Sequence, residues 1–368
     1  MKYETDKRIV MTLDAGGTNF VFSAIQGNRE VVSPLTLPSN AHDLDKCLAT
    51  IIHGFTRVKT QLADEPVAIS FAFPGPADYP RGIIDDLQNL PGFKGGVALG
   101  PMLAEKFNLP IFINNDGDLY AYGEAIAGFL PYINNRLAQA GSPKRYQNLL
   151  GVTLGTGFGA GIVRNGELFL GDNSAGAEIF LVRNKLHPQT DVEESASIRG
   201  IKRVYIEKTN INPAKCPSPK EIYEIGIGKK AGNRQAAIEA YRHLAIAVGD
   251  ALANVNTIFD GIIVIGGGIS GAHPLFLPAI VDEMNSQYEL PDGGHISRLL
   301  MRVFNLEDEN DLKHFLRGNS KEILVPGTNK KITYDPMKRT GVGISRIGAS
   351  PAIALGAYAF ALNAIDSG

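Results

Sequence analysis

One strand–glycine turn–strand pattern occurs twice in this chain, and this duplication constrains the fold more than any other feature. The segment IVMTLDAGGTNF (9–20) places a β-branched run before a glycine turn, and a second strand, a GN turn and a third strand follow. The pattern returns about 140 residues later in NLLGVTLGTGFGAGIVRNGELF (148–169), with an Asn-Gly hairpin turn. Helical stretches alternate with strands between the copies, which indicates an α/β architecture. We therefore predict two homologous lobes.

The composition excludes several classes of partner. Lys and Arg number 36 against 38 Asp and Glu, so there is no basic footprint for nucleic acid or an acidic membrane. No apolar run approaches the roughly 20 residues that span a bilayer, and the first residues hold no apolar signal core. Two cysteines are too few for a disulfide framework or a four-thiolate zinc site. We expect a cytoplasmic protein that binds a small molecule, and neither nucleic acid nor a membrane.

Three glycine clusters follow apolar runs and are candidate anion sites. They are DAGGT (14–18), GTGFGAG (155–161) and GGGISG (266–271). Glycine lets backbone N–H groups approach an anion without a Cβ in the way. A dinucleotide fold needs an acidic residue at a strand end about 20 residues later, whereas the chain after Gly271 has a helical pattern. A P-loop ATPase is excluded because the sequence contains no G-x-x-x-x-G-K-[ST].

An aspartate, Asp14, stands at the mouth of the first glycine turn, where it would repel a bare phosphate. A nucleotide triphosphate carries Mg²⁺, and a carboxylate attracts that metal, usually through its water shell, while Thr18 and nearby N–H groups face the oxygens. On Asp14 alone, a simple turn-capping role is an equal alternative. The duplicated pattern favours the metal, because two facing turns hold a triphosphate from both sides. We expect ATP and Mg²⁺ as cofactors.

Five ordered blocks carry a family resemblance. They are DAGGTN, NLPGF (89–93), INNDGDLYAYGE (113–124), TLGTGFGAGIVRNGELFLGDNSAGAE (153–178) and IIVIGGGIS (262–270). In order and approximate spacing they resemble the ROK family of bacterial sugar kinases and sugar-responsive repressors, within the actin, hexokinase and Hsp70 fold. The resemblance implies ATP-dependent phosphorylation of a hexose or N-acetylhexosamine hydroxyl.

The same resemblance implies a two-lobe, actin-like (ribonuclease H-like) α/β fold with a cleft between the lobes. The N-terminal lobe is expected over residues 1–117, completed by a C-terminal helix at about 350–368. The C-terminal lobe is expected over 118–349, and it includes an added segment at about 285–346. Within that segment the sequence predicts a solvated helix in LEDENDLKHFL and a hairpin in EILVPGTNKKITYD.

The resemblance also implies roles for particular residues. Asp116 is the expected catalytic base, since a carboxylate can orient a sugar hydroxyl and accept its proton during phosphoryl transfer. The alternative is that Asp-Gly here only forms a turn, but a helical pattern follows it. The residues expected to bind the sugar are Asn89, Asn115, Glu178 and Glu193, with Glu194 as the alternative to Glu193 and a surface salt bridge as the alternative role for either. The residues expected around the phosphates are Gly16, Gly17, Thr18, Thr156 and Gly157, with Gly267 and Gly268 near the nucleoside.

The sequence departs from the family after Glu178. Many members carry a histidine three residues after this glutamate, followed by cysteines, and together these hold a structural zinc. Here Leu181 takes the place of the histidine, and no cysteine follows until Cys216. Zinc needs about four N or S ligands, so we predict no zinc site. Without this imidazole, the sequence does not decide whether the substrate is glucose, fructose, mannose, N-acetylglucosamine or N-acetylmannosamine.

Two rival functions use the same fold. A sugar sensor or regulator would bind without phosphorylating, but family repressors carry an N-terminal helix-turn-helix domain, for which residues 1–8 leave no room. The presence of both Asp14 and Asp116 also favours a kinase over a non-catalytic sugar-binding protein. A chaperone or filament ATPase would need no sugar pocket, which the family positions Asn89, Asn115 and Glu178 argue against. The family resemblance and the exposed-looking added segment favour a homodimer.

Overall fold

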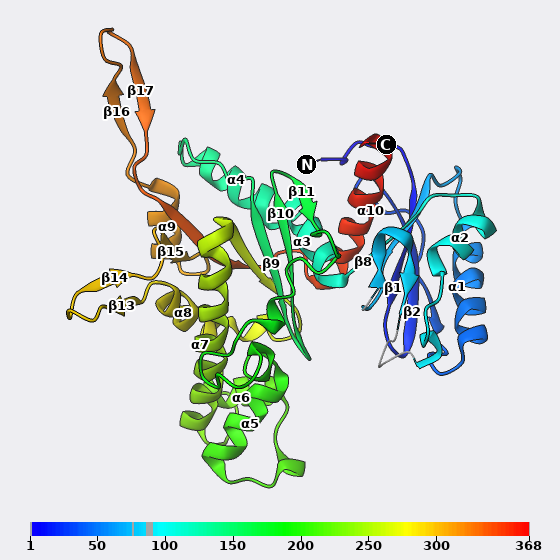
Figure 1. The fold of residues 1–368 in the computed structure, drawn as a ribbon, viewed down its shortest axis with the longest axis horizontal. Coiled ribbons are helices and arrows are strands. Elements are labelled where there is room, and N and C mark those ends of the chain that lie inside the picture. Colours follow the sequence, from blue (N-terminus) through cyan, green and yellow to red (C-terminus); the bar gives the residue numbers. More distant parts are fainter. Residues whose placement is uncertain (1, 76, 86–90, 368) are drawn as a thin grey trace. The chain divides into compact units, whose positions relative to one another are not determined.

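The structure, a computed structural model, divides into two compact units (Figure 1). It describes residues 2–75, 77–85 and 91–367. The first unit comprises Met1–Pro131, Gly161–Ala177 and Ile347–Gly368, and the second comprises Tyr132–Ala160 and Glu178–Arg346. Strands and helices alternate along the chain, which confirms the predicted α/β class. Within the described ranges, no helix is long and apolar enough to cross a membrane.

The first unit combines a mixed sheet with helices from both ends of the chain. Apart from the elements in residues 161–177, its strands are β1 (Val10–Ala15), β2 (Asn19–Gln26), β3 (Arg29–Glu30), β4 (Leu35–Pro38), β5 (Ala68–Ala72), β6 (Ala77–Asp78), β7 (Ile83–Ile84) and β8 (Ile111–Asn114), and its helices are α1 (Leu44–Lys59), α2 (Leu99–Phe107), α3 (Asp116–Ile126) and α10 (Ala349–Ser367). The sheet order is β3-β2-β1-β5-β8, with β4 paired to β2.

The rest of the chain forms a second sheet, several helices and two separate hairpins. The strands are β9 (Leu149–Leu154), β10 (Phe158–Arg164), β11 (Glu167–Phe169), β12 (Ile262–Gly266), β13 (Gln287–Glu289), β14 (His295–Ser297), β15 (Arg302–Asn305), β16 (Lys321–Leu324), β17 (Lys331–Tyr334) and β18 (Arg339–Ile344), and the helices are α4 (Phe129–Gln139), α5 (Ile198–Thr209), α6 (Pro219–Gly226), α7 (Arg234–Phe259), α8 (His273–Met284) and α9 (Glu309–Arg317). The sheet order is β11-β10-β9-β12-β18-β15.

The two sheets share one topology. The order β3-β2-β1-β5-β8 is matched strand for strand by β11-β10-β9-β12-β18. The hairpins β2–β3 and β10–β11 each close through a two-residue turn with positive φ at both positions, 57° and 61° at Gly27 and Asn28 and 53° and 81° at Asn165 and Gly166. This turn type matches the twist of antiparallel strands. The internal duplication predicted from the sequence is therefore confirmed.

The first sheet is covered by different helices on its two faces. Because side chains alternate along a strand, Met11 and Leu13 pack with Phe55 of α1, whereas Val10 packs with Tyr358 of α10. The C-terminal helix is thus part of the first unit. Asp14, two residues after Thr12 and four after Val10, lies on the α10 face of the sheet.

Helix α3 lies in direct backbone contact with α10. A Cβ on Gly123 would lie 1.9 Å from the carbonyl oxygen of Ala352, and a Cβ on Gly356 would lie 1.9 Å from that of Leu119. Glycine at both positions allows this approach. The predicted boundary between the lobes lies at residue 117, whereas in the structure α3 and residues 161–177 belong to the first unit. The packing of α3 against α10 explains why α3 belongs there.

The segment predicted as an addition, residues 285–346, is only partly peripheral. Its helix and hairpin appear as α9 and β16–β17, as predicted. However, β15 and β18 belong to the second sheet, where β18 occupies the position that β8 has in the first. Every residue of β18 is buried. The peripheral parts are therefore the hairpins β13–β14 and β16–β17, whose strands are exposed throughout.

Candidate functional site

Two acidic side chains lie at one edge of the first sheet. Parallel pairing places Asp14 beside Ala72 and Ala72 beside Asn114, so the ends of β1, β5 and β8 coincide. Asp116 lies two residues after the end of β8 and begins α3. The carboxyl ends of parallel strands are where α/β sheets place their ligands, and both Asp14 and Asp116 are exposed there. The structure thus brings together the residues predicted for the metal and for the base.

The start of α3 fixes the backbone around Asp116. Asn115 is the N-cap residue, and its Oδ1 accepts a hydrogen bond from Gly117 N at 2.8 Å. The same N–H also donates to Asp116 Oδ1 at 2.9 Å. Asn115 Nδ2 has no partner among the described residues, so it can donate to a ligand. A second donor at this edge is Nδ2 of Asn114, which is buried and without a partner in the described part of the chain.

The surroundings of Asp116 change its acidity. The carboxylate is accessible to solvent, while the protein atoms packed around it reduce its hydration. This desolvation raises the pKa of Asp116 above its usual range, and the negative charge of Asp14 raises it further. The hydrogen bond from Gly117 N acts in the opposite direction. The result is a carboxylate that is a stronger base than an ordinary aspartate.

The first glycine turn is accessible, and a serine forms hydrogen bonds to its backbone. Gly16, Gly17 and Thr18 are all exposed. Ser39 Oγ donates to the carbonyl oxygen of Gly17 at 2.7 Å, and Ser39 N donates to that of Thr18 at 2.9 Å. These bonds fix the turn's carbonyl groups. Sequence reasoning missed Ser39, because nothing in the pattern near Ser39 links it to a turn some twenty residues earlier.

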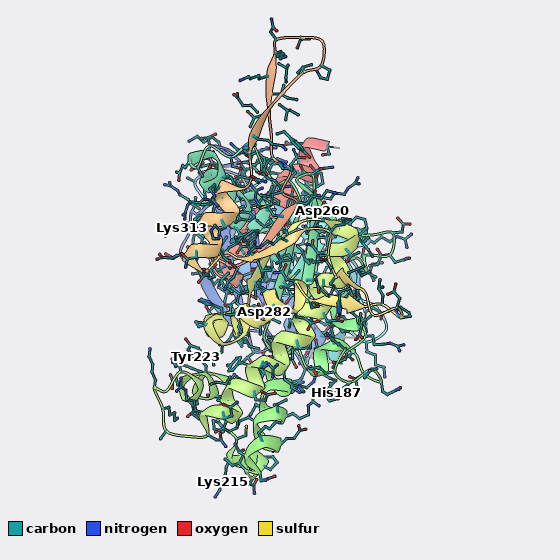
Figure 2. All side chains as sticks on the ribbon, turned by 90° about the vertical axis from the view of Figure 1, so that its left-hand side faces the viewer. His187, Lys215, Tyr223, Asp260, Asp282 and Lys313 are labelled. Carbon is teal, nitrogen blue, oxygen red and sulfur yellow. The ribbon has the colours of Figure 1, made fainter. Side chains whose placement is uncertain are left out.

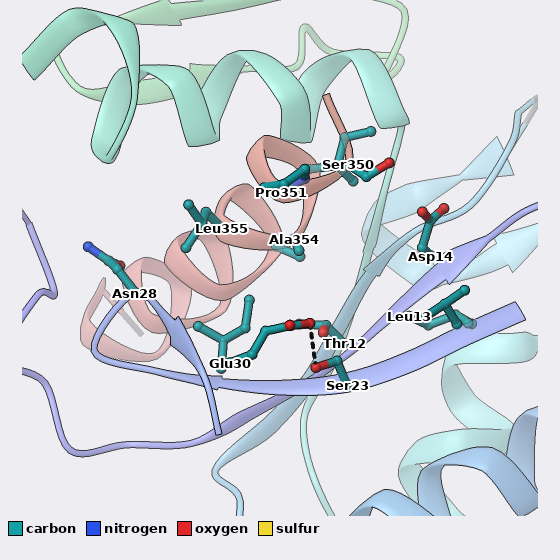
Figure 3. Close-up of a pocket in the computed structure, with 14 residues that line it drawn as sticks. Thr12, Leu13, Asp14, Ser23, Asn28, Glu30, Ser350, Pro351, Ala354 and Leu355 are labelled. Carbon is teal, nitrogen blue, oxygen red and sulfur yellow. Dashed lines mark hydrogen bonds between the residues drawn. The ribbon is translucent and has the colours of Figure 1, made fainter. Parts of the chain in front are cut away.

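A cavity that sequence reasoning also missed extends from Asp14 along the first sheet (Figure 3). It has a volume of about 290 Å³ and lies between β1–β2 and α10. Ala354 and Leu355 contribute apolar surface, and Ser23 Oγ donates to Glu30 Oε1 at 2.8 Å within it. Apart from Asp14, none of the residues that line it was among the predicted site residues.

The second unit forms an equivalent pair of turns. β9 and β12 are parallel neighbours, with Thr153 beside Gly266, so the turns after them lie at one sheet edge. Gly267 has a φ of 86°, and a Cβ there would lie 2.4 Å from the carbonyl oxygen of Leu154. Only glycine fits this position. The structure therefore places Thr156, Gly157, Gly267 and Gly268 together, with Thr156 and Gly268 exposed.

Glu193 and Glu194 differ in what they contact. Glu193 Oε2 accepts a hydrogen bond from Phe158 N at 3.0 Å, and its Oε1 pairs with Arg199 at 2.9 Å. A Cβ on Gly157 would lie 2.7 Å from Glu193 Oε2. The Glu194 side chain instead pairs with Arg199 at 2.8 Å and is 42% exposed, against 22% for Glu193. Glu193 therefore braces the glycine turn, and Glu194 lies toward solvent.

Glu178 follows a strained residue. Ala177 has a φ of 63°, a conformation that non-glycine residues rarely adopt and that often marks functional sites. Glu178 is exposed and precedes a short 3-10 turn that ends at Leu181, whose side chain is 64% exposed. Asn89, the remaining predicted sugar ligand, lies outside the described residues.

The loop after Leu181 is organised by a fully buried asparagine. Asn184 Nδ2 donates to Asp191 O at 3.1 Å and to Ser195 Oγ at 2.9 Å. Its Oδ1 accepts from Leu186 N and His187 N at 3.0 and 3.2 Å. In the part of the chain that the structure describes, no group of three or more His, Cys, Asp or Glu side chains is placed to hold a metal. The hydrogen bonds of Asn184 connect both ends of this loop.

A second cavity lies beside Gly268. It has a volume of about 330 Å³ and is lined from α6, α7 and the turn after β12. Tyr223, Ile227 and Ile269 contribute apolar surface, and Lys229 contributes a charge. Tyr223 packs edge-on against Tyr241 with ring centroids 6.4 Å apart. The cavity has the size and mixed polarity of a small-ligand site, and sequence reasoning pointed to none of the residues that line it outside the glycine cluster 266–271.

Comparison with known proteins identifies related sequences and structures. The sequence profile of the ROK family matches residues 10–296. The chain is 56% identical to the glucokinase from Parabacteroides distasonis, whose crystal structure superposes with a TM-score of 0.91 over 99% of both chains. It is 18% identical to a ROK family glucokinase from Streptomyces griseus in complex with glucose and AMPPNP, with a TM-score of 0.60 over 95% of this chain and 98% of that one.

Two curated relatives have different activities. A glucokinase from Halalkalibacterium halodurans is 27% identical over 76% of this chain and 86% of its own length. A xylose repressor from Bacillus spizizenii is 25% identical over 68% of this chain and 61% of its own length.

Proposed function

The chain belongs to the ROK family, and from that premise we propose that it transfers the γ-phosphoryl group of ATP to a hydroxyl of a hexose or N-acetylhexosamine. The observation that carries this proposal is the pair Asp14 and Asp116 at one sheet edge, with an accessible glycine turn beside Asp14. The similarity to glucokinases from two organisms supports the class of reaction.

Asp116 acts as the general base in this proposal. The sugar hydroxyl donates a hydrogen bond to the carboxylate and transfers its proton to it while the hydroxyl oxygen bonds to the γ-phosphorus and the bond to ADP breaks. A base is most effective when its pKa approaches the working pH, which the raised pKa of Asp116 favours. Asn115, one residue away, is proposed to orient the sugar through its Nδ2. Glu178 is the further proposed sugar ligand.

The described residues fit a bound Mg-ATP. Mg²⁺ in phosphoryl-transfer sites keeps several waters and takes one or two carboxylates plus phosphate oxygens, and the exposed Asp14 provides one carboxylate. When bound, Mg²⁺ neutralises charge on the phosphates and so favours transfer. The residues proposed around the phosphates are Gly16, Gly17, Thr18, Thr156 and Gly157, with Gly267, Gly268 and the cavity beside Gly268 for the nucleoside.

The alternative is a sugar-binding sensor or regulator of the same family. The similarity to a xylose repressor favours it. A sensor needs the sugar ligands but no base, whereas this chain combines an aspartate of raised pKa with a second carboxylate at the same edge. We therefore place the kinase first.

A coupled ADP-release assay with Mg-ATP and a panel of hexoses and N-acetylhexosamines tests the proposal. Turnover is expected with at least one sugar and none without sugar. Isothermal titration calorimetry with the same sugars is the companion measurement. Sugar binding without turnover would overturn the kinase and establish the sensor.

Glu193→Ala is expected to lower kcat/KM for ATP by roughly 10- to 100-fold, because it removes a hydrogen bond between a charged group and Phe158 N in the glycine turn. Glu194→Ala is the matched control, since it removes only an exposed ion pair and should change kcat/KM less than about fivefold. Steady-state kinetics with ATP and sugar varied separately provide the measurement. If Glu193→Ala raised only the KM for the sugar, Glu193 would instead be a ligand of the sugar.

Ile227→Asp is expected to raise the KM for ATP by roughly 10- to 100-fold, because it removes apolar surface from the proposed nucleoside cavity and adds a negative charge. The KM for the sugar should stay within about twofold. Ile227→Val, which keeps most of the apolar surface, is the control and should behave nearly as the wild type. Equal changes in both KM values would show that the cavity does not hold the nucleoside.

A further inference from the structure

A β-hairpin arm, residues 319–335 with strands β16 and β17, extends away from the body of the second unit. Figures 1 and 2 show it from two directions, and in both views the arm stands clear of the rest of its unit. All residues of both strands are exposed. An isolated two-stranded hairpin is at best marginally stable in water. The arm therefore lacks the packing that usually keeps such a hairpin ordered.

One face of the arm is apolar. In the antiparallel register Ile323 lies opposite Ile332, and Tyr334 lies two residues further along the same face. All three are among the large exposed hydrophobic residues, at 37%, 44% and 47% exposure. Lys321 lies opposite Tyr334 on this face, and the opposite face carries Leu324, Thr333 and the ion pair between Lys331 and Glu322, so three of the arm's four exposed large hydrophobic side chains share one face. Grouping apolar side chains on one face of an exposed ribbon is typical of an interaction surface.

The base of the arm is rigidly held. Asn319 N donates to Asp335 Oδ1 at 3.1 Å, which joins the two ends of the arm. Asp335 pairs at 2.5 Å with Arg339, whose side chain is fully buried and also donates to Phe315 O at 2.7 Å. A buried and fully bonded arginine keeps its geometry. The arm therefore projects in a defined direction, which lowers the entropy cost of binding through it.

The hairpin β13–β14 is complementary to the arm. Tyr288 lies opposite Ile296 on one face, and both are about half exposed. Between residues 287 and 297 the acidic groups are Glu289 and Asp292, and neither forms an ion pair within the described residues. Arg298, which follows β14 and lies over the Tyr288 ring, has its charge paired with Asp250. Between residues 321 and 334 the arm instead has three lysines against one glutamate. An acidic hairpin and a basic arm, each with an apolar face, attract one another.

We propose that the arm packs its apolar face onto the β13–β14 hairpin of a second copy of this chain, and that the second copy returns the same contact. A stable interface buries roughly 800 Å² per partner, and two reciprocal contacts bury twice the area of a single one. Reciprocal contacts also produce a closed two-fold dimer. This assigns a surface to the homodimer and does not depend on the kinase activity.

Sedimentation velocity over a protein concentration series, without sugar or nucleotide, tests the apolar contact. The wild type is expected to be a dimer. Ile323→Ser combined with Ile332→Ser should raise the dimer dissociation constant at least about 100-fold, since each substitution acts at both contacts. The control is Leu324→Ser, an exposed residue on the opposite face of the arm, and it should remain dimeric. A monomeric wild type, or a double variant that still dimerises, would overturn the proposal.

A charge exchange tests the partner surface. Lys321→Glu with Lys330→Glu should weaken the dimer, and adding Glu289→Lys with Asp292→Lys should restore it. Failure to restore would show that the arm meets another surface. Replacing residues 320–334 by a short glycine–serine link between Asn319 and Asp335 provides a second route to the monomer. Circular dichroism melting checks that each variant is folded.

Discussion

Asp116→Asn is expected to lower kcat by about 10²- to 10⁴-fold, the contribution of a positioned general base, while sugar binding stays close to that of the wild type. Asparagine keeps the size of the side chain and can still accept the hydrogen bond from Gly117 N. ADP release and calorimetry measure the two effects. In the wild type, kcat/KM should fall as the pH drops through the raised pKa of Asp116.

The same substitution should increase stability at neutral pH. The pKa of Asp116 is raised above its ordinary value of 3.8 in the folded protein, so its protonation contributes stability that is fully present below about pH 3.8 and lost as the pH rises through the folded pKa. Asparagine carries no charge and avoids that loss. Thermal unfolding between about pH 4 and pH 8 should therefore show a difference from the wild type that grows with pH. A variant that is less stable at neutral pH, or retains full activity, would contradict the assignment.

Gly123→Ala is expected to destabilise the protein by about 3 kcal/mol, although alanine is the better helix former by about 1 kcal/mol. The new methyl group would lie 1.9 Å from the carbonyl oxygen of Ala352, so α3 and α10 must separate. Asp116 begins α3, and the separation should also lower kcat. Thermal unfolding and activity at a temperature where the variant is folded provide the measurements.

Gly271→Ala is the control for this prediction. A Cβ there would meet nothing within 4 Å, and the backbone conformation is ordinary. Without ligand, its free energy of unfolding should stay within about 0.5 kcal/mol of the wild-type value. Equal melting temperatures for Gly123→Ala and Gly271→Ala would show that the two helices have room to move apart.

The sequence by itself determined the elements whose signals are local. Alternating apolar residues and an Asn-Gly or Gly-Asn turn specify a strand hairpin within about 20 residues, and both copies, β1-β2-β3 and β9-β10-β11, lie where that pattern placed them. The start of α3 at Asp116 was also predictable, because Asn115 is a favourable N-cap before a helical run. Family motifs then indicated which of these elements carry candidate site residues.

Tertiary structure decided which distant residues meet. The sequence could not separate Glu193 from Glu194, because neighbours in a 3-10 turn point about 120° apart and only the fold shows which one faces Phe158 N. Asn184 was missed for a similar reason, since its partners are backbone atoms of a loop that has no periodic pattern. The place of β18 inside the second sheet depends on strand pairing across more than seventy residues. Local chemistry specifies turns, strands and caps, whereas long-range packing specifies the neighbours of each side chain, and the candidate site is built from those neighbours.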